Sequence, residues 1–221
     1  MFVVFWMVRV VVVTLGFDEK FAIRGLLRVG LGFGDCVLVF TARPVDERVE
    51  RALGVLREFI SRYYDGVKFR VVDVDVQDFY GAVLSVGSVL KEEVLKEENV
   101  EVIFNFSGGM RSLILETLVA AVALGIDGMV EVELENFAGV ISFPLRVIKL
   151  SSPLKEEYRV ILRTLLEVGE MNLSDLARRL GVAKSTIHTR IKHLINLNLI
   201  KAEYRGKSLI CTATEMAKLF I

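Results

Sequence analysis

Apolar and polar positions follow two alternating patterns through the first 150 residues. Short runs of mostly apolar, often β-branched residues predict buried strands at residues 3–14, 36–41, 69–74 and 102–106. Apolar residues at helical spacing predict helices near residues 19–30, 45–64, 78–98 and 109–124. Strands that alternate with helices in this way are typical of βαβ units around a parallel sheet.

The pattern changes after Gly125. Two extended runs at residues 129–134 and 140–147 are joined by residues 135–139, which predicts a hairpin that closes the edge of the sheet. We therefore expect residues 1–150 to form an α/β domain with a doubly wound, Rossmann-like and mainly parallel sheet.

The last third of the chain has a different order of elements. Ser151-Ser152-Pro153 is a helix start, with serine as the cap and proline tolerated in the first turn. Helices are expected at residues 154–168, 174–180 and 184–196, then extended runs at 200–204 and 208–212 around a hairpin tip, and a short terminal helix. Residues 151–221 should form a small second domain.

The apolar start of the chain does not fit a signal peptide or a membrane helix. Residues 1–13 are fewer than the roughly 20 needed to span a bilayer, Arg9 lies among them, and no basic stretch precedes them. We expect a cytoplasmic protein without a membrane segment. Cys36 and Cys211 lie far apart, and two histidines offer little to a zinc site, so neither a disulfide nor a metal or other cofactor is expected.

Charge divides the chain into two unlike parts. Residues 1–150 hold 16 Lys and Arg against 21 Asp and Glu, whereas residues 151–221 hold 12 against 7. The basic C-terminal part is therefore the candidate nucleic-acid binder.

The C-terminal part has the spacing of a helix-turn-helix. A short amphipathic helix ends at Gly181, and a second helix follows at once, with Ile187, Ile191 and Leu194 at inward-facing spacing. The polar outer face can enter a major groove, and the hairpin tip can act as a wing on the neighbouring backbone. The candidate contacts to double-stranded DNA are Lys184, Ser185, Thr186, His188, Thr189, Arg190, Lys192, Arg205 and Lys207.

Two alternatives remain for this part: a dimerisation or protein-binding module, or a charged face that is merely solvated. Residues 180–186 nevertheless resemble winged helix-turn-helix transcription regulators. Ala183 departs from the serine cap that these proteins often have.

Two polar loops of the first domain follow strands that should flank the ligand crevice of a doubly wound sheet. They are residues 14–18 and residues 105–111. Gly108 and Gly109 allow a phosphate to approach the backbone, while Ser107, Arg111 and the next helix supply donors. The glycine pair by itself is equally compatible with ordinary turn chemistry.

Common nucleotide-binding motifs are missing. The chain has no Gly-x-x-x-x-Gly-Lys-Ser/Thr loop, and no Gly-x-Gly-x-x-Gly follows the first strand. Residues 40–43 lack the acidic residue that a dinucleotide cofactor needs after the second strand.

Together, Thr14-Leu15-Gly16-Phe17-Asp18 and Asn105-Phe106-Ser107-Gly108-Gly109-Met110-Arg111, followed by a winged helix, resemble the CRISPR-associated Rossmann-fold (CARF) family. The resemblance is to its winged-helix transcription regulators of type I-A CRISPR-Cas systems, a form of antiviral defence. It implies a homodimer that binds a cyclic oligoadenylate, such as cyclic tetra-adenylate, across the two-fold axis and a palindromic DNA site. The ligand-binding residues it implies are Thr14, Leu15, Gly16, Phe17, Asp18, Asn105, Ser107, Gly108, Gly109, Met110 and Arg111.

The leading hypothesis is therefore a ligand-responsive DNA-binding regulator and not an enzyme. One alternative is a ring nuclease, since some members of the family cleave their ligand, but Asp18 is the one obvious general base in the two loops. Another is a winged-helix regulator that senses a different adenine nucleotide. Arg24 is a weaker candidate for the pocket, and it could instead pair with a nearby carboxylate.

Overall fold

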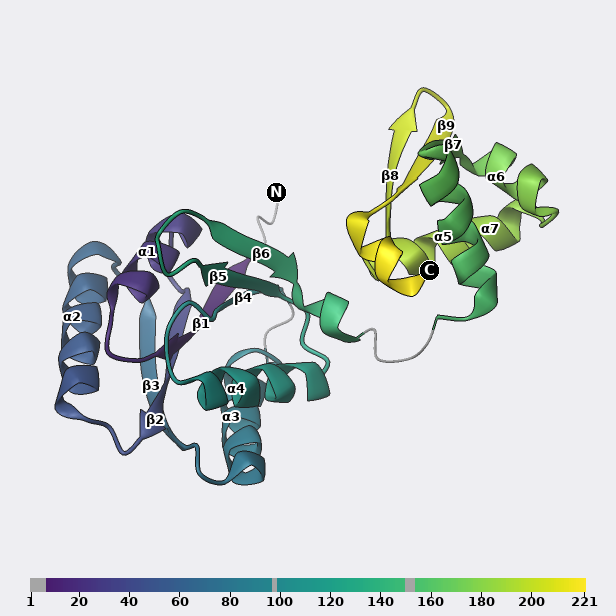
Figure 1. Cartoon of the computed structure of the whole chain (residues 1–221). Coiled ribbons are helices and arrows are strands. Elements are labelled where there is room, and N and C mark those ends of the chain that lie inside the picture. The colour runs from purple at the N-terminus through teal and green to yellow at the C-terminus, as the bar shows by residue number, and fades with distance from the viewer. Residues whose placement is uncertain (1–6, 97–98, 150–153) are drawn as a thin grey trace. The chain divides into compact units, whose positions relative to one another are not determined.

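The computed structural model describes residues 7–96, 99–149 and 154–221. The chain divides into two compact units, Met1–Arg146 and Val147–Ile221 (Figure 1). The boundary expected between residues 150 and 151 and the helix start expected at Ser151-Ser152-Pro153 lie outside the described residues.

The first unit is built on one six-stranded sheet with the order β3-β2-β1-β4-β5-β6. The first five strands run parallel, and β6 returns antiparallel to β5 as the expected edge hairpin. The strands are β1 (Val8–Leu15), β2 (Cys36–Arg43), β3 (Lys68–Asp75), β4 (Val100–Asn105), β5 (Met129–Glu133) and β6 (Val140–Pro144). This is the doubly wound, Rossmann-like arrangement that the sequence predicts.

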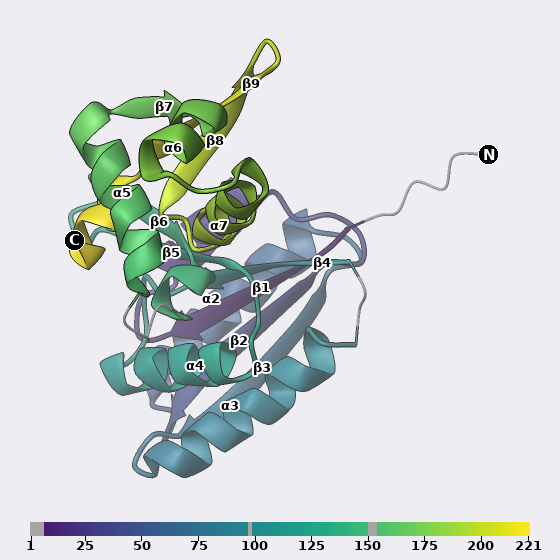
Figure 2. The ribbon, with the colours of Figure 1, turned by 90° about the vertical axis from the view of Figure 1, so that its right-hand side faces the viewer.

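Helices cover both faces of this sheet (Figure 2). The helices α1 (Lys20–Val29) and α2 (Glu47–Tyr63) pack on one face, and α3 (Phe79–Glu93) and α4 (Arg111–Ala123) pack on the other. The side chains of β1 alternate between the two cores, with Val11 and Val13 beneath the first pair of helices and Val10 and Val12 beneath the second. Both faces are buried, which explains why this strand is apolar throughout.

Three element bounds are more than two residues away from the sequence-based expectation. The helix expected to reach residue 98 ends at Glu93, and residues 97–98 lie outside the described part of the chain. Residues 3–6 of the strand expected from residue 3 lie outside the described part of the chain, and β1 begins at Val8. The last extended run stops at Pro144, where a 3-10 helix, Leu145–Lys149, begins, because proline has no N–H to continue a strand ladder.

The second unit has three helices and a three-stranded antiparallel sheet with the order β7-β9-β8. The side chains of Ile187, Ile191 and Leu194 lie fully buried in its core, as their spacing predicts. The strand β7 has three residues, too few to show a pattern in the sequence. The elements are α5 (Glu156–Val168), β7 (Glu170–Asn172), α6 (Leu173–Leu180), α7 (Lys184–Asn196), β8 (Ile200–Arg205), β9 (Ser208–Ala213) and a 3-10 helix, Glu215–Phe220.

A tight turn joins the two helices of the helix-turn-helix. The Asn172 side chain caps α6 by accepting the Asp175 N–H at 2.9 Å. Gly181 ends the helix with a φ of 64°, a left-handed conformation that glycine adopts without strain. The helix α7 begins three residues later, at Lys184, so the turn between the two helices is short.

No described helix in the protein is both long and apolar enough to cross a membrane.

Candidate functional site

The two polar loops of the first unit lie in backbone contact. The Thr14 hydroxyl of β1 donates to the carbonyl oxygen of Gly108 at 2.6 Å. A Cβ atom at Gly109 would lie 2.9 Å from Cβ of Thr14, and one at Gly16 would lie 3.2 Å from the Gly109 backbone. Gly109 also has a φ of 93°, which few other residues adopt. Glycine at these positions therefore allows the carboxyl ends of β1 and β4 to meet.

A cavity of about 660 Å³ opens where these loops meet, within the range of roughly 300–1,000 Å³ typical of small-molecule sites. It lies at the carboxyl ends of the parallel strands, where the order of the sheet reverses between β1 and β4. Its lining residues are Leu15, Gly16, Phe17, Asp18, Phe21, Ala42, Arg43, Pro44, Asp46, Val49, Val76, Gln77, Gly108, Gly109, Met110 and Arg111.

Eight of the eleven ligand-binding residues expected from the sequence line this cavity. The other three, Thr14, Asn105 and Ser107, are absent from its lining and hold the loops in place instead. Thr14 and Asn105 are each 1% exposed, and Ser107 is half-buried. The structure therefore separates the residues that can touch a ligand from those that position them.

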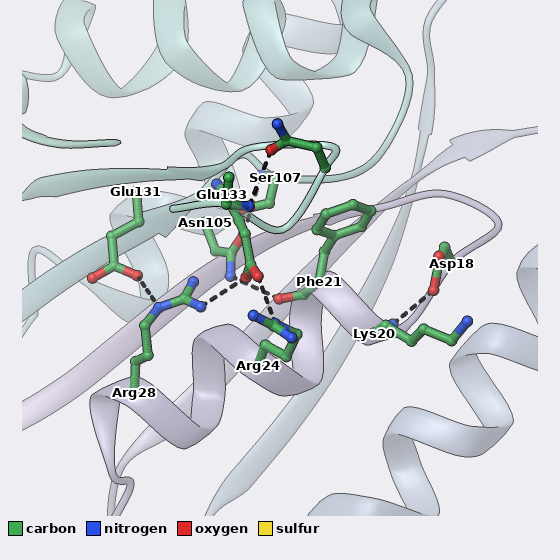
Figure 3. A network of polar contacts seen from close by, with 11 residues as sticks. Asp18, Lys20, Phe21, Arg24, Arg28, Asn105, Ser107, Glu131 and Glu133 are labelled. Carbon is green, nitrogen blue, oxygen red and sulfur yellow. Dashed lines mark hydrogen bonds and ion pairs between the residues drawn. The ribbon is translucent and has the colours of Figure 1, made fainter. Parts of the chain in front are cut away.

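Asn105 and Ser107 connect the second loop to α1 and β5 (Figure 3). The Asn105 Oδ1 accepts the Ser107 N–H at 3.1 Å, and its Nδ2 donates to the carbonyl oxygen of Phe21 at 3.4 Å. The Ser107 Oγ accepts the backbone N–H of Glu133 at 2.9 Å. Both side chains thus use their polar atoms within the protein.

A cluster of ion pairs lies next to the hydrogen bonds of Asn105 and Ser107 (Figure 3). The Glu133 carboxylate, 1% exposed as a side chain, pairs with Arg24 at 2.5 Å and with Arg28 at 2.7 Å. Arg28 also reaches Glu131 at 3.4 Å. Arg24, the weaker pocket candidate, is absent from the cavity lining and pairs with a carboxylate, the alternative left open from the sequence.

The acidic residues of the cavity are occupied by backbone donors. The Asp18 Oδ1 accepts the Lys20 N–H at 2.9 Å. The Asp46 Oδ1 accepts the N–H groups of Arg48 and Val49 at the start of α2, and these bonds, that to Val49 foremost, hold the pKa of Asp46 below its usual range. Each carboxylate is therefore fixed as a cap or turn acceptor.

The cationic residues of the cavity have no such partners. Among the described residues, neither Arg111 nor Arg43 forms an ion pair, and Arg43 makes one long hydrogen bond, to the carbonyl oxygen of Asp73 at 3.4 Å. Arg111 stands in the first turn of α4, where the unpaired N–H groups of a helix also favour an anion. The cavity can accordingly hold a phosphate.

Sequence reasoning missed the half of the cavity that comes from the carboxyl ends of β2 and β3 and from the start of α2. Ala42 and Arg43 end β2 and Pro44 follows it, while Val76 and Gln77 follow β3. The available signal was positional, because carboxyl ends of neighbouring parallel strands meet at one edge of a sheet. No residue motif marks these segments.

In the second unit, most of the expected DNA-contacting residues are accessible. Lys184, Ser185, Thr186, Thr189, Lys192 and Lys207 are exposed, and His188 is half-buried. Two arginines are engaged elsewhere. Arg190 pairs with Glu157 of α5 at 2.8 Å, and Arg205 of the wing pairs with Glu170 at 2.7 Å and with Glu203.

A notch of about 290 Å³ separates the start of α7 from the wing. Lys184 and His188 of α7 face Lys207 and Tyr204 of the wing across it, and Asn172 and Ser174 close it at the start of α6. The notch thus joins the helix-turn-helix to the wing in one basic and polar surface.

Within the described residues, no group of three or more His, Cys, Asp or Glu side chains is placed to hold a metal ion.

Two family models match the chain. Residues 9–144, more than half of the sequence, match the Csa3 CRISPR-associated Rossmann-like domain. The chain belongs to this family. Residues 159–201 match a model of winged helix-turn-helix DNA-binding domains. The Csa3 domain therefore spans the sheet and its cavity, and the DNA-binding match includes α6 and α7.

Similarity to other known proteins is weak. Comparison with curated proteins gives no match. The structure of BpsR of Bordetella bronchiseptica, described as regulated in DNA binding by 6-hydroxynicotinic acid, is 20% identical over 33% of this chain and 56% of its own, with a TM-score of 0.30. The match therefore spans about half the length of BpsR.

Two further structures show the same low level of similarity. The transcriptional repressor BigR of Xylella fastidiosa is 22% identical over 34% of this chain and 76% of its own, with a TM-score of 0.29. The RuvB Holliday junction branch migration motor of Thermotoga maritima is 17% identical over 96% of this chain and 77% of its own, with a TM-score of 0.27. None of these likenesses bears on the function of the Csa3 domain.

Proposed function

We propose that this protein is a CRISPR-associated, DNA-binding transcription regulator whose Csa3 domain binds a cyclic oligoadenylate, cyclic tetra-adenylate in the first instance. The observation that carries the proposal is the cavity between the two glycine loops, which presents two arginines without carboxylate partners in the described chain. Its ligand should therefore be anionic and small. The same chain also carries a winged helix-turn-helix match.

The glycine loops have the groups that a phosphodiester needs. Gly108 and Gly109 expose backbone at the cavity wall, and Arg111 adds a guanidinium that can bind two phosphate oxygens. Asp18 and Asp46 lie near these groups, but both carboxylates already accept backbone N–H groups. The guanidinium groups of Arg43 and Arg111 are thus available to bind an anionic ligand.

Pairing of two copies is supported by an exposed apolar side of α4. Leu115 and Val119 are 56% and 41% exposed, whereas Glu116 and Thr117 on the other side are 1% and 0% exposed. A surface helix ordinarily buries its apolar side, so an exposed apolar side indicates an interaction surface. The helix begins at Arg111, which lines the cavity, so a second copy seated on this surface would approach the ligand site.

Binding without cleavage is the expected chemistry. The titratable side chains that line the cavity are Asp18, Arg43, Asp46 and Arg111, and no histidine is among them. A histidine is the commonest general base, and the one carboxylate of the glycine loops, Asp18, accepts a backbone N–H at its Oδ1. Incubation with radiolabelled cyclic tetra-adenylate should yield no linear product; a linear product would favour a ring nuclease.

The DNA-binding surface consists of the exposed start of α7 and the wing on either side of the notch. Lys184 and Lys207 are free of ion pairs within the described residues. Each lysine that contacts a phosphate releases a counterion, which gives DNA affinity its dependence on salt. We expect the Lys207→Ala variant to bind DNA more weakly and with a shallower salt dependence.

The experiment that tests the function compares DNA affinity with and without saturating cyclic tetra-adenylate, by fluorescence anisotropy on the promoter of the associated CRISPR genes. The ring should change the affinity of the wild type by about 5- to 150-fold, the usual range of allosteric coupling. Arg111→Ala should lose this response, whereas Arg51→Ala, an exposed arginine of α2 outside the cavity, should keep it. Equal DNA affinity with and without the ring in the wild type would overturn the proposal.

A further inference from the structure

The half of the cavity formed by β2, β3 and α2 has a chemistry different from that of the glycine loops. Its floor is apolar, with Ala42, Pro44, Val49 and Val76. A phosphate placed against these four side chains would lose hydration without gaining a hydrogen-bond donor from them, which is costly. This half, defined by those four residues together with Phe17 and Gln77, is called the outer slot below.

We infer that the outer slot binds a purine base of the ligand and that Gln77 distinguishes adenine from guanine. The inference rests on the proposed function, because a nucleotide ring must occupy the cavity. A purine has apolar faces and a polar edge, and the outer slot offers an apolar floor with polar side chains at its rim.

Phe17 supplies a wall against which a base can stack. The guanidinium of Arg48 lies 3.8 Å from the centroid of its ring, which covers one face of the phenyl group and restrains its orientation. The ring is still 51% exposed and lines the cavity. Bases stack on aromatic faces of this kind in many nucleic-acid-binding proteins, without regard to base identity.

Gln77 supplies the means to read the edge of the base. Its backbone N–H donates to the Asp75 Oδ1 at 3.1 Å, which fixes the turn, while its solvent-exposed side-chain amide forms no hydrogen bond with the described part of the protein. An amide both donates and accepts, so it matches the N7 acceptor and N6 donor of adenine with two bonds. Guanine presents acceptors at both N7 and O6, and the carbonyl oxygen of the amide would oppose one of them.

Arg43 is the competing reader on the same rim. A guanidinium has donors alone, so it would favour the two acceptors of guanine. Its terminal nitrogen is already directed to the carbonyl oxygen of Asp73, 3.4 Å away. We therefore assign Arg43 to the phosphate and Gln77 to the base, and the two assignments predict opposite base preferences.

The test measures binding of the full-length protein to cyclic tetra-adenylate and to the same ring made with 7-deaza-adenine, which lacks the N7 acceptor. Wild type should bind the modified ring at least tenfold more weakly, because each of the two chains that hold the ring loses one hydrogen bond. Gln77→Ala loses both bonds to adenine in each chain, so it should bind the unmodified ring at least tenfold more weakly and should not distinguish the two rings. Asn196→Ala, an exposed amide of α7 outside the cavity, should behave as wild type.

Each contrary outcome has a distinct meaning. Equal binding of both rings by wild type, or a Gln77→Ala variant that still distinguishes them, overturns the role of Gln77 and leaves the proposed function standing. Tighter binding of cyclic tetra-guanylate than of cyclic tetra-adenylate by wild type also overturns the role of Gln77, and it assigns the edge of the base to Arg43. A wild type that binds neither adenine ring overturns both this inference and the proposed ligand.

Discussion

Single atoms decide how closely the two ligand loops approach each other. At Gly109 an added Cβ would lie 2.9 Å from Cβ of Thr14 and 3.0 Å from its carbonyl carbon, so neither neighbour can move without shifting β1. The φ of 93° adds strain to any side chain at this position.

The Gly109→Ala substitution should therefore reduce the free energy of unfolding by about 1–3 kcal/mol and weaken ring binding. The matched change is Gly54→Ala in α2, where an added Cβ meets nothing within 4 Å. It should stabilise the protein by about 0.5–1 kcal/mol, the usual advantage of alanine over glycine in a helix. Urea denaturation measures both, and equal effects of the two substitutions would refute the close-contact account.

Glu116 makes the stability of the first unit depend on pH. Burial, followed by the nearby charge of Asp75, raises the pKa of this carboxyl group, and its Oε2 has no hydrogen-bond partner in the described structure. The folded protein then holds a proton that the unfolded chain releases at lower pH. The contribution of Glu116 to stability is thus full in acid and is lost as the pH rises from the ordinary glutamate pKa towards the raised value.

The Glu116→Gln substitution should remove this dependence. The variant should gain stability over wild type at pH 7 and gain little at pH 4, as measured by urea denaturation at the two pH values. Glu58→Gln, an exposed glutamate of α2, is the control and should leave the difference between the two pH values unchanged. A Glu116→Gln variant less stable than wild type at pH 7 would contradict the proposed effect of burial.

At the scale of elements, α3 and α4 both expose large apolar side chains to water. Leu115 and Val119 face outward from α4, and the neighbouring α3 adds Tyr80 and Leu84, which are 79% and 72% exposed. Both helices lie on the same face of the sheet (Figure 2). A second copy of the chain would remove these apolar side chains from water.

The Leu115→Glu substitution should shift the protein from dimer to monomer and weaken ring binding in parallel, because it places a charge in an apolar contact. Leu27→Glu is the matched change on α1, since Leu27 is 59% exposed and outside the α3–α4 surface. Sedimentation equilibrium measures the oligomeric state of the two variants. A Leu115→Glu variant that remains dimeric would show that the copies meet elsewhere.

Strand and helix positions of both units could be predicted because their apolar residues follow a regular period. The orientation of α4 could not, because this helix is apolar on nearly all sides and its sequence does not mark the side that faces the core. The three residues of β7 were missed because their extended state depends on pairing with β9, about 40 residues later in the chain.

The same limit applies to the site. The loops 14–18 and 105–111 could be found because polar residues and glycines directly follow apolar strands. The bracing role of Ser107 could not, because its partner is the backbone of Glu133, 26 residues later. The outer slot likewise depends on segments that the sheet brings together, and neither Pro44 nor Gln77 belongs to a local motif.

For the whole molecule, a ligand that changes DNA affinity must itself bind with an affinity that depends on DNA, and by the same factor. The two parts of the chain differ in net charge. Residues 1–150 hold 16 Lys and Arg against 21 Asp and Glu, and residues 151–221 hold 12 against 7. The acidic excess of the first unit is compatible with an anionic ligand because the cavity presents its positive charge locally, at Arg43 and Arg111.

The most direct test of the central claim is isothermal calorimetry of the wild type with cyclic tetra-adenylate. We predict saturable binding of one ring per two chains, weakened at least tenfold in Arg111→Ala through the loss of a charged hydrogen bond to phosphate. The exposed Arg51→Ala control should bind as the wild type does. No heat of binding at any ring concentration, confirmed by equilibrium dialysis, or equal affinity of Arg111→Ala and wild type, would contradict the assignment of this cavity as the sensor site.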